Sequence, residues 1–291
     1  MKDALAGDLL KAVSRSFYLT VAWLPREMQQ AVAVAYLLAR STDSVADADS
    51  APVAQRHEAL HRMAAAIANG DIAAADALAL EFRTHSVAHP AEAELLARFG
   101  EALRAMLALP PQQIELIRSV LATIIQGQMW DLSFFEEHSS VLSDAQTRQY
   151  IYDVAGCVGQ FWTRLGLLSM GERFCDPSAA ALMEEAGVRY GCGLQLVNIL
   201  RDRSSDAAHG RCYLCSDASV WADRAERYLR DGLDYSRRLR TYRLRFTGML
   251  PALLGLKTLR ALRRARPDST HVKIPRRAVY ASMLRALVAA F

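Results

Sequence analysis

The chain is poor in the residues that interrupt helices. Among its 291 residues there are only 15 glycines and 9 prolines, while 52% of the residues are hydrophobic. No convincing alternation of apolar and polar residues marks a strand, and no segment repeats at the period of a solenoid protein. Alanine, leucine and arginine are abundant instead, which favours helix over sheet. We therefore predict an all-α protein, with residues 1–291 forming a single domain of packed helices around a central cavity.

Cysteine is scarce too, and so are long apolar runs. The number of cysteines, five, is odd, which argues against a disulfide framework and favours a reducing cytoplasm.

No signal peptide is evident, and no uncharged run is long enough to span a bilayer. We expect a cytoplasmic location. The basic region 257–277 and the apolar helix after it could touch the anionic inner face of the membrane peripherally, or this helix could simply pack on the bundle.

A strong excess of charge of one sign is also missing. The formal net charge is only +4, and the isoelectric point is near 8.9. This balance does not suggest a nucleic-acid partner, and it fits an anionic substrate or an anionic membrane surface equally well. Nothing in the sequence points to an obligate protein partner.

Proline and capping residues divide the chain into helices. The helices that these signals predict cover 53–69, 71–85, 145–170, 217–240 and 250–264, and others begin near Pro25, Pro177 and Pro275. The helix over 145–170 follows the cap Ser143-Asp144, and we expect it to run unbroken.

Two pairs of aspartates stand out against this background. Asp43 and Asp47 lie in the segment RSTDSVAD, and Asp202 and Asp206 lie in NILRDRSSD. Each pair is spaced by four residues, so in a helix both carboxylates project from one face, one turn apart. Two such faces turned toward each other would line a cavity with hard oxygen ligands, which Mg²⁺ prefers and shares with phosphates. The double acidic motif therefore indicates chemistry on a diphosphate.

The second pair belongs to a longer polar stripe. Gln195, Asn198, Asp202 and Asp206 follow one another at steps of three, four and four along one helix face. A buried polar stripe costs free energy unless each group finds a partner. Metal-bound carboxylates, with an amide to orient phosphate or water, would satisfy it. The alternative is a solvated face, but the flanking residues are apolar, so we expect at least Asn198 to point inward.

The first pair is less specific, because aspartates four residues apart are common and Asp49 follows closely. The helix dipole disfavours carboxylates near a helix C-terminus, so a metal is one compensating partner, and a solvated helix end is the alternative. Arg40 stands three residues before Asp43 and shares its face. It could form a salt bridge, which is worth little if exposed, or clamp a diphosphate.

Taken together, these segments resemble the squalene/phytoene synthase family of head-to-head prenyl transferases. The family's opening segment, through its first aspartate motif, resembles SRSFYLTVAWLPREMQQAVAVAYLLARSTDSVAD, and its central segment resembles YIYDVAGCVGQFW. The second aspartate motif and the Gly-Arg-x-Tyr after it resemble LQLVNILRDRSSD and HGRCYLC. The segment VKIPRRAVY is closer to squalene synthases than to phytoene synthases. The resemblance covers most of the chain and implies an isoprenoid-synthase-like helical bundle.

The resemblance implies a role for each residue that matches a family motif. The two aspartate pairs would hold Mg²⁺ against the substrate diphosphates, and Tyr150 matches a tyrosine implicated in proton removal. The residues that match substrate-binding positions, near phosphate or along the prenyl pocket, are Ser14, Ser16, Phe17, Arg40, Val154, Val158, Gly159, Gln195, Asn198, Arg201, Arg211 and Tyr213.

The implied reaction condenses two molecules of farnesyl diphosphate. It would give presqualene diphosphate and then, with NADPH, squalene, and Lys273 matches a position linked to NADPH in squalene synthases. Squalene synthases place an aromatic residue shortly before the proline that matches Pro251, at a position that serves the reductive half-reaction. Here Phe246 stands one residue early and Thr247 takes that place.

Two kinds of alternative stay open at this stage. A reductant-free enzyme would make dehydrosqualene, phytoene, presqualene diphosphate or hydroxysqualene. A non-catalytic family member would bind prenyl lipids or serve in assembly, although the retained aspartates and Tyr150 argue against it. The sequence does not fix the prenyl chain length.

Overall fold

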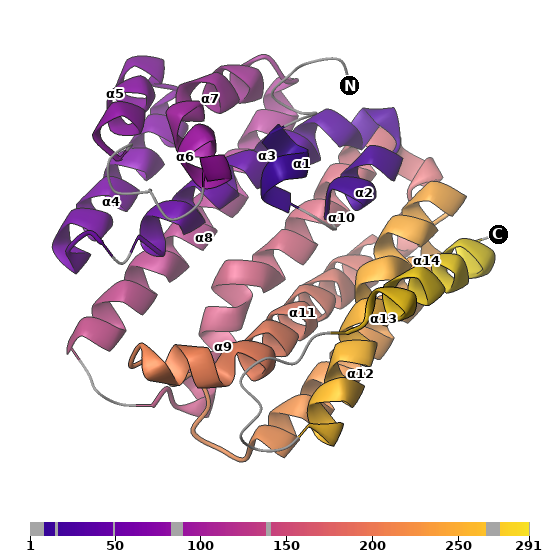
Figure 1. The fold of residues 1–291 in the computed structure, drawn as a ribbon. Helices are drawn as coiled ribbons and strands as arrows, with labels where there is room; N and C mark the ends of the chain where they lie inside the picture. The colour runs from indigo at the N-terminus through magenta and orange to yellow at the C-terminus, as the bar shows by residue number, and fades with distance from the viewer. Residues whose placement is uncertain are drawn as a thin grey trace. The chain divides into compact units, whose positions relative to one another are not determined.

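The computed structural model describes residues 9–14, 17–48, 50–82, 90–137, 141–265 and 274–290 (Figure 1). Within these ranges the chain forms helices and no strand, as the composition predicts. The helices group into two compact units, residues 1–137 and residues 138–291. The single domain over 1–291 stays a prediction.

The first unit is built around helix α3. In chain order its helices are α1 (Leu10–Ser14), α2 (Phe17–Trp23), α3 (Arg26–Ala46), α4 (Val53–Asn69), α5 (Ile72–Phe82), α6 (Pro90–Ala97), α7 (Phe99–Leu107) and α8 (Pro111–Glu137). α3 packs against α4, α7 and α8, in the indigo-to-magenta part of Figure 1. Five consecutive residues of α3, 31–35, are buried. Since neighbours enclose α3, the aspartates at its C-terminal end are held on a rigid element.

Proline and glycine set several helix boundaries in this unit. Pro25 and Pro52 directly precede α3 and α4, where the missing N–H costs nothing because the first helical donors have no partner. α4 has the predicted bounds and ends at Gly70, whose φ of 69° suits glycine. The helix predicted over 71–85 is present as α5, and residues 83–85 lie outside the described residues.

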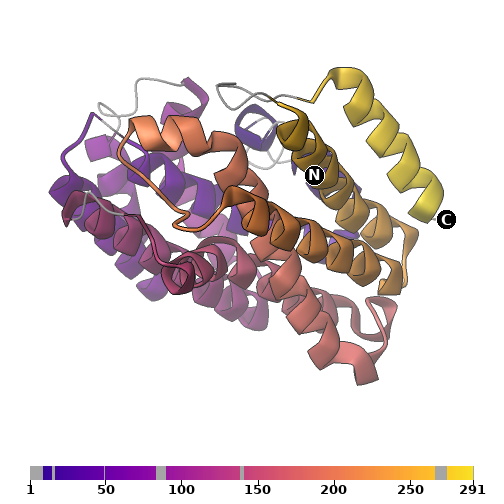
Figure 2. The ribbon, with the colours of Figure 1, turned by 90° about the horizontal axis from the view of Figure 1, so that it is seen from below.

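The second unit contains α11, which with 29 residues is the longest helix among the described residues. In chain order its helices are α9 (Asp144–Ile151), η2 (Tyr152–Gly156), α10 (Cys157–Met170), η3 (Gly171–Arg173), η4 (Pro177–Ala179), α11 (Ala180–Ala208), α12 (Ala218–Arg238), α13 (Tyr242–Arg264) and α14 (Arg276–Ala290). α11, α12 and α13 lie side by side, and α14 lies along α13, as Figure 1 and Figure 2 show from two directions.

The prediction of an unbroken α-helix over 145–170 is wrong in one respect. Residues 152–156 form a π-helical segment, η2, between α9 and α10. This segment is pressed against α11, since a Cβ on Gly191 would lie 2.2 Å from the Ala155 carbonyl oxygen. Single π-helical turns inside helices occur frequently at functional sites. The predicted start is confirmed, because Ser143 and Gln146 form a capping box at α9.

Glycines also let α10 and α11 approach each other closely. A Cβ on Gly159 would lie 1.9 Å from the carbonyl oxygen of Gly187, and a Cβ on Gly187 would lie 2.7 Å from that of Gly159. Both distances are shorter than real Cβ atoms tolerate, so this helix spacing requires glycine on both sides. The contact fixes α11, the helix of the second aspartate pair, against the central segment.

α13 begins at Tyr242, earlier than the predicted start at 250. Thr241 caps it, because its hydroxyl accepts a hydrogen bond from the Leu244 N–H at 3.3 Å. Pro251 lies inside the helix, although proline usually kinks or ends a helix. Among the residues that the structure describes, no helix is long and apolar enough to cross a membrane.

Candidate active site

The first aspartate pair lies where α3 ends. Asp43 is in the last turn, and Asp47 caps the C-terminus with an N–H that donates to the Asp43 carbonyl at 2.8 Å. The Asp43 carboxylate accepts a hydrogen bond at Oδ1 from Gln128 Nε2 at 2.6 Å, and its other oxygen lies 3.7 Å from an Arg40 nitrogen. The Asp43 carboxylate is therefore oriented by side chains of both α3 and α8.

The surroundings of Asp43 raise the pKa of its carboxyl. The pKa of this carboxyl rises from 3.8 to about 6, chiefly because burial desolvates it; Arg40 opposes the rise and the charge of Asp47 adds to it. The side chain is nevertheless 44% exposed, so water reaches one side of the carboxylate. A divalent cation at these two carboxylates would offset both the desolvation and their mutual repulsion.

Arg40 is shared between two carboxylates. Besides lying near Asp43, its guanidinium donates to Glu92 Oε1 at 2.5 Å, and Glu92 lies in the first turn of α6. Arg40 thus forms a salt bridge, one of its two predicted roles, while the diphosphate clamp stays a prediction. Sequence reasoning identified neither Glu92 nor Gln128. Glu92 carries no signal, but Gln128 is a polar residue within a strongly apolar helix, and that contrast could have singled it out.

The second aspartate pair lies near the C-terminal end of α11. Arg201 donates two hydrogen bonds to Asp202, from Nε to Oδ1 at 2.9 Å and from a terminal nitrogen to Oδ2 at 2.5 Å. The pKa of Arg201 is raised, first by these hydrogen bonds and then by the charges of Asp202 and Asp206. Arg201 therefore lies in the field of both carboxylates. Such a fork of donors also matches two oxygens of a phosphate.

The polar stripe that leads to this pair is only partly as predicted. Asn198 Nδ2 donates to Gln195 Oε1 at 3.3 Å, so the two amides are neighbours on α11. The expectation that Asn198 points inward is wrong, because its side chain is exposed. Leu196, Val197 and Ile199 take the buried positions of this turn, and Asn198 is left on the opposite side of the helix.

The turn after α11 folds back toward the second pair. Gly210 adopts a φ of 76°, a left-handed conformation that glycine reaches without a steric cost. The next N–H, that of Arg211, donates to the Asp206 carbonyl oxygen at 2.8 Å. The predicted phosphate-binding Arg211 is thereby held close to the backbone of the second pair.

This turn also places two tyrosines together. Tyr213 stacks on Tyr150, with ring centroids 4.9 Å apart and ring planes inclined by 18°. The Thr147 hydroxyl donates to the Tyr213 carbonyl oxygen at 2.6 Å, which ties the turn to α9. The central segment and the Gly-Arg-x-Tyr segment, which sequence analysis treated separately, are therefore parts of one arrangement.

The remaining predicted substrate-binding residues lie in the central segment and near the N-terminus. Val154 lies in η2 and Val158 is exposed in α10, whereas Gly159 packs on α11. Ser14 is buried, and its hydroxyl donates to the Leu10 carbonyl oxygen within α1. The other predicted positions lie outside the described residues, namely Ser16, Lys273 and the side chain of Phe17.

Each aspartate pair offers oxygen donors suited to Mg²⁺. Within the described ranges, no group of three or more His, Cys, Asp and Glu gathers at one point. Mg²⁺ does not require such a group, because it commonly takes one or two carboxylates and leaves its other positions to phosphate oxygens and water. The effect of Asp47 on the pKa of Asp43 shows that the first two carboxylates share one electrostatic environment. The residues present therefore fit Mg²⁺ bound together with a phosphate.

Comparison with known proteins decides the family. The family described as squalene/phytoene synthase matches residues 10–219, which is more than half of the chain. The chain belongs to the squalene/phytoene synthase family. The match includes both aspartate pairs and the stacked tyrosines, and it ends at the start of α12.

The relatives of this chain are distant and differ in activity. The bifunctional lycopene cyclase/phytoene synthase of Blakeslea trispora is 27% identical over 212 residues, 72% of this chain and 32% of the relative. The presqualene diphosphate synthase of Rhodopseudomonas palustris is 30% identical over 206 residues, 71% of this chain and 60% of the relative. The squalene synthase of Schizosaccharomyces pombe is 26% identical over 299 residues, 92% of this chain and 61% of the relative. The chain thus spans less than two thirds of each of these three relatives.

Solved structures share the fold of this chain. TcSQS, solved in complex with a ligand, gives a TM-score of 0.77 at 22% identity and covers 98% of this chain and 87% of that one. Squalene synthase HpnC from Alicyclobacillus acidocaldarius gives a TM-score of 0.55 at 18% identity, over 89% and 92% of the two chains. These likenesses concern the fold alone, and they confirm the predicted all-α, isoprenoid-synthase-like class.

Proposed function

We propose that this protein joins two molecules of farnesyl diphosphate head to head in a reaction that depends on Mg²⁺. The first product is presqualene diphosphate, and reduction with NADPH then gives squalene. The observation that carries the proposal is that a chain of the squalene/phytoene synthase family contains both aspartate pairs and stacks Tyr150 on Tyr213, in the segment that follows the second pair.

The chemistry begins at the substrate diphosphates, which the two aspartate pairs would hold through metal ions. Bound Mg²⁺ supplies positive charge that makes diphosphate a better leaving group. The guanidinium of Arg201 can donate to two oxygens at once, as its two hydrogen bonds to the Asp202 carboxylate show. If Asp202 were a metal ligand, the guanidinium of Arg201 would be available for phosphate oxygens. Arg211, held beside Asp206, adds a second positive charge.

The carbon chemistry needs a proton acceptor and a dry pocket. As the C1–O bond of one substrate breaks, its electron pair leaves with diphosphate and an allylic cation remains. The double bond of the second substrate attacks C1, and loss of a proton closes a cyclopropane ring. Tyr150 would relay this proton to the released diphosphate, which is the stronger base. The stacked faces of Tyr150 and Tyr213 suit a cationic neighbour, and water must be kept away because it would quench the cation.

A reaction that stops before reduction is the second candidate. Phe246, the aromatic residue nearest to the position that squalene synthases use, is buried in the core between α13 and α14, and Thr247 is buried too. In addition, the relative that is 30% identical is a presqualene diphosphate synthase. Both observations favour an enzyme that ends at presqualene diphosphate or at a reductant-free product.

Product analysis tests the proposal directly. The purified chain is incubated with farnesyl diphosphate and Mg²⁺, with and without NADPH, and the products are identified by mass spectrometry. We expect squalene only in the presence of NADPH, and presqualene diphosphate or dehydrosqualene in its absence. The same product under both conditions would establish the second candidate and make Lys273 structural.

The outcome that contradicts both candidates is equally clear. If neither farnesyl nor geranylgeranyl diphosphate yields a product, the chain is a non-catalytic member of its family. Removal of Mg²⁺ by a chelator then distinguishes a simple prenyl-lipid carrier from a protein that binds substrate through the aspartate pairs. A simple carrier would bind the prenyl chain without metal, whereas binding through the aspartate pairs requires it.

A further inference from the structure

The outer face of the C-terminal helix α14 is apolar and basic. Three large side chains on this face, Tyr280, Leu284 and Val288, are 66%, 64% and 70% exposed. They are spaced by four residues, so they form one stripe along the helix. Every other exposed residue of α14 is alanine or arginine, namely Arg276, Arg277, Ala281, Arg285 and Ala289.

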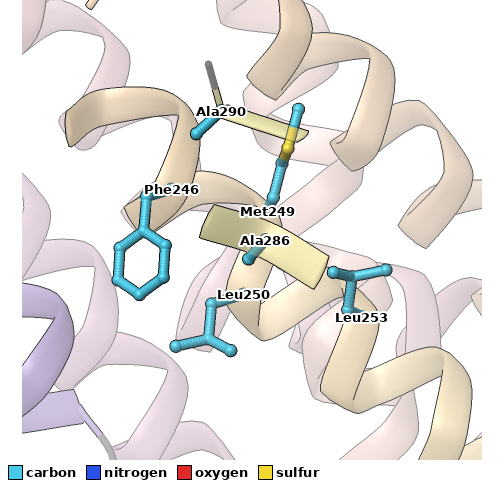
Figure 3. Close-up of a cluster of buried hydrophobic side chains, with 6 residues drawn as sticks. All are labelled: Phe246, Met249, Leu250, Leu253, Ala286 and Ala290. Atoms are coloured by element: carbon cyan, nitrogen blue, oxygen red, sulfur yellow. The ribbon is translucent and has the colours of Figure 1, made fainter. Parts of the chain in front are cut away.

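The opposite face of α14 is already occupied by α13. Ala286 and Ala290 pack into a core cluster with four large side chains of α13, drawn in Figure 3. Polar contacts hold both ends, because Lys257 Nζ donates to the Ala278 carbonyl oxygen at 2.7 Å and Arg245 donates to that of Ala290 at 3.3 Å. With its inner face packed in this way, α14 leaves the apolar stripe exposed.

The part of the sequence that carries this stripe is rich in basic residues. Residues 235–291 contain 14 of the 35 lysines and arginines of the chain but only one of the 31 aspartates and glutamates. At the stripe itself, the helical period places Arg277 in line with Leu284 and Val288, and Arg285 beside them. Within the described part of the chain, Arg276, Arg277 and Arg285 have no ion-pair partner. The stripe and the arginines beside it are therefore complementary to a partner that has negative charge at its surface and an apolar interior.

We propose that the outer face of α14 docks on an anionic lipid bilayer, with the apolar stripe at the acyl boundary and the arginines at the headgroup phosphates. A helix of 15 residues is about 22 Å long at 1.5 Å per residue, shorter than the hydrocarbon layer. α14 would therefore lie in the plane of the interface. A second copy of the chain would bring like charges together, which disfavours self-association through this face. The inference does not rest on the proposed function, because docking needs no substrate.

Sedimentation with lipid vesicles tests this docking. The full chain is mixed, without substrate, with vesicles of phosphatidylcholine alone or of equal parts phosphatidylcholine and phosphatidylglycerol. We expect binding to the anionic vesicles that weakens as salt is raised, and much weaker binding to the neutral ones. The double variant Arg277→Gln/Arg285→Gln is expected to lose about twenty-fivefold in vesicle affinity, at about fivefold for each arginine. Leu284→Ser/Val288→Ser is expected to lose on the order of tenfold or more.

Matched variants and one hydrodynamic measurement decide the result. Leu80→Ser removes an equally exposed leucine, 70% exposed on α5, and Arg26→Gln/Arg227→Gln removes two exposed arginines elsewhere. Both controls should bind as the wild type does, and circular dichroism should show all variants folded. Equal binding to neutral and anionic vesicles, or unchanged binding by the two α14 variants, would overturn the proposal. So would a dimer in sedimentation equilibrium that Leu284→Ser/Val288→Ser converts to a monomer.

Discussion

Gln128 donates a hydrogen bond of 2.6 Å from its amide nitrogen to Oδ1 of Asp43, and so joins α8 to the last turn of α3. Only the NH₂ end of the amide can donate to a carboxylate, so the bond supports the ionised form of Asp43. Gln128 itself is buried. The residue therefore acts on the first aspartate pair by orienting one carboxylate and by opposing the desolvation that raises its pKa.

Replacing Gln128 with leucine removes this donor while roughly preserving volume. We expect the Mg²⁺ concentration needed for half-maximal turnover to rise by about 10- to 100-fold, the usual cost of losing a hydrogen-bond partner of a metal ligand. Gln126→Leu is the control, since Gln126 is exposed on the same helix. Product formation measured across a Mg²⁺ titration distinguishes the two variants. An unchanged Mg²⁺ dependence in Gln128→Leu would show that the hydrogen bond has no role in metal binding.

Replacing Asp202 with asparagine tests the second pair. The change leaves the side chain isosteric but removes the negative charge, so we expect turnover to fall by at least about 100-fold. Asp234→Asn is a matched control, because Asp234 also pairs with an arginine, Arg237, at 2.5 Å on an exposed helix face. The helical signal in circular dichroism should stay the same for both. Turnover near the wild-type rate in Asp202→Asn would remove Asp202 from the metal site.

Replacing Tyr150 with phenylalanine separates the hydroxyl from the ring. The stack on Tyr213 is retained, so the free energy of unfolding should change by less than about 1 kcal/mol. Turnover should fall by about 100-fold or more if the hydroxyl relays a proton. Tyr152→Phe, a change two residues away that removes only a hydroxyl bonded to Gln160, should stay active. Equal rates for wild type and Tyr150→Phe would exclude this role.

The helices and the location of both aspartate pairs could be predicted from the sequence, because both depend on local signals. Proline at helix starts and the four-residue spacing of the aspartates are visible within a few neighbours. The bond between Gln128 and Asp43 could not be predicted, since it joins residues 85 positions apart and its formation depends on how α8 packs on α3. The stack of Tyr150 on Tyr213 has the same origin.

Two local predictions were wrong for physical reasons. The apolar neighbours of Asn198 suggested that it points inward. Those neighbours bury their own side of the helix, however, and leave Asn198 exposed on the other side. The π-helical segment over 152–156 carries no periodic signal, because its extra residue is accommodated by contact with α11 rather than by its own side chains. Periodicity describes a helix well only where neighbouring elements do not deform it.

Replacing Gly159 with alanine tests the close contact of α10 with α11. Alanine is favoured over glycine in a helix by about 1 kcal/mol, but its Cβ would lie 1.9 Å from the Gly187 carbonyl oxygen. The clash outweighs the gain, and we expect a net loss of about 1–3 kcal/mol in the free energy of unfolding. Leu168→Ala, at an exposed position of the same helix, should cost about 0.5 kcal/mol or less. Denaturant unfolding measures both, and a stabilised Gly159→Ala would contradict the observed helix spacing.

Glu226 predicts how the stability of the second unit depends on pH. It accepts hydrogen bonds from Arg230 at 2.6 Å and from Arg263 of α13 at 2.5 Å, and these bonds lower the pKa of its carboxyl below 4.5. A lowered folded-state pKa adds stability at pH values above the unfolded-state pKa, and this stability is lost as the pH falls through the folded-state pKa.

Glu226→Gln should therefore lower the free energy of unfolding at neutral pH by about 1 kcal/mol or less, since the ion pairs of Glu226 are partly exposed. The gap to the wild type should close well below pH 4.5. The control Glu115→Gln, a substitution at an exposed position, should change the free energy of unfolding at neutral pH by about 0.5 kcal/mol or less. Urea unfolding across this range measures the difference, and a gap that persists in acid would show that Glu226 stabilises the fold by packing and not by its charge.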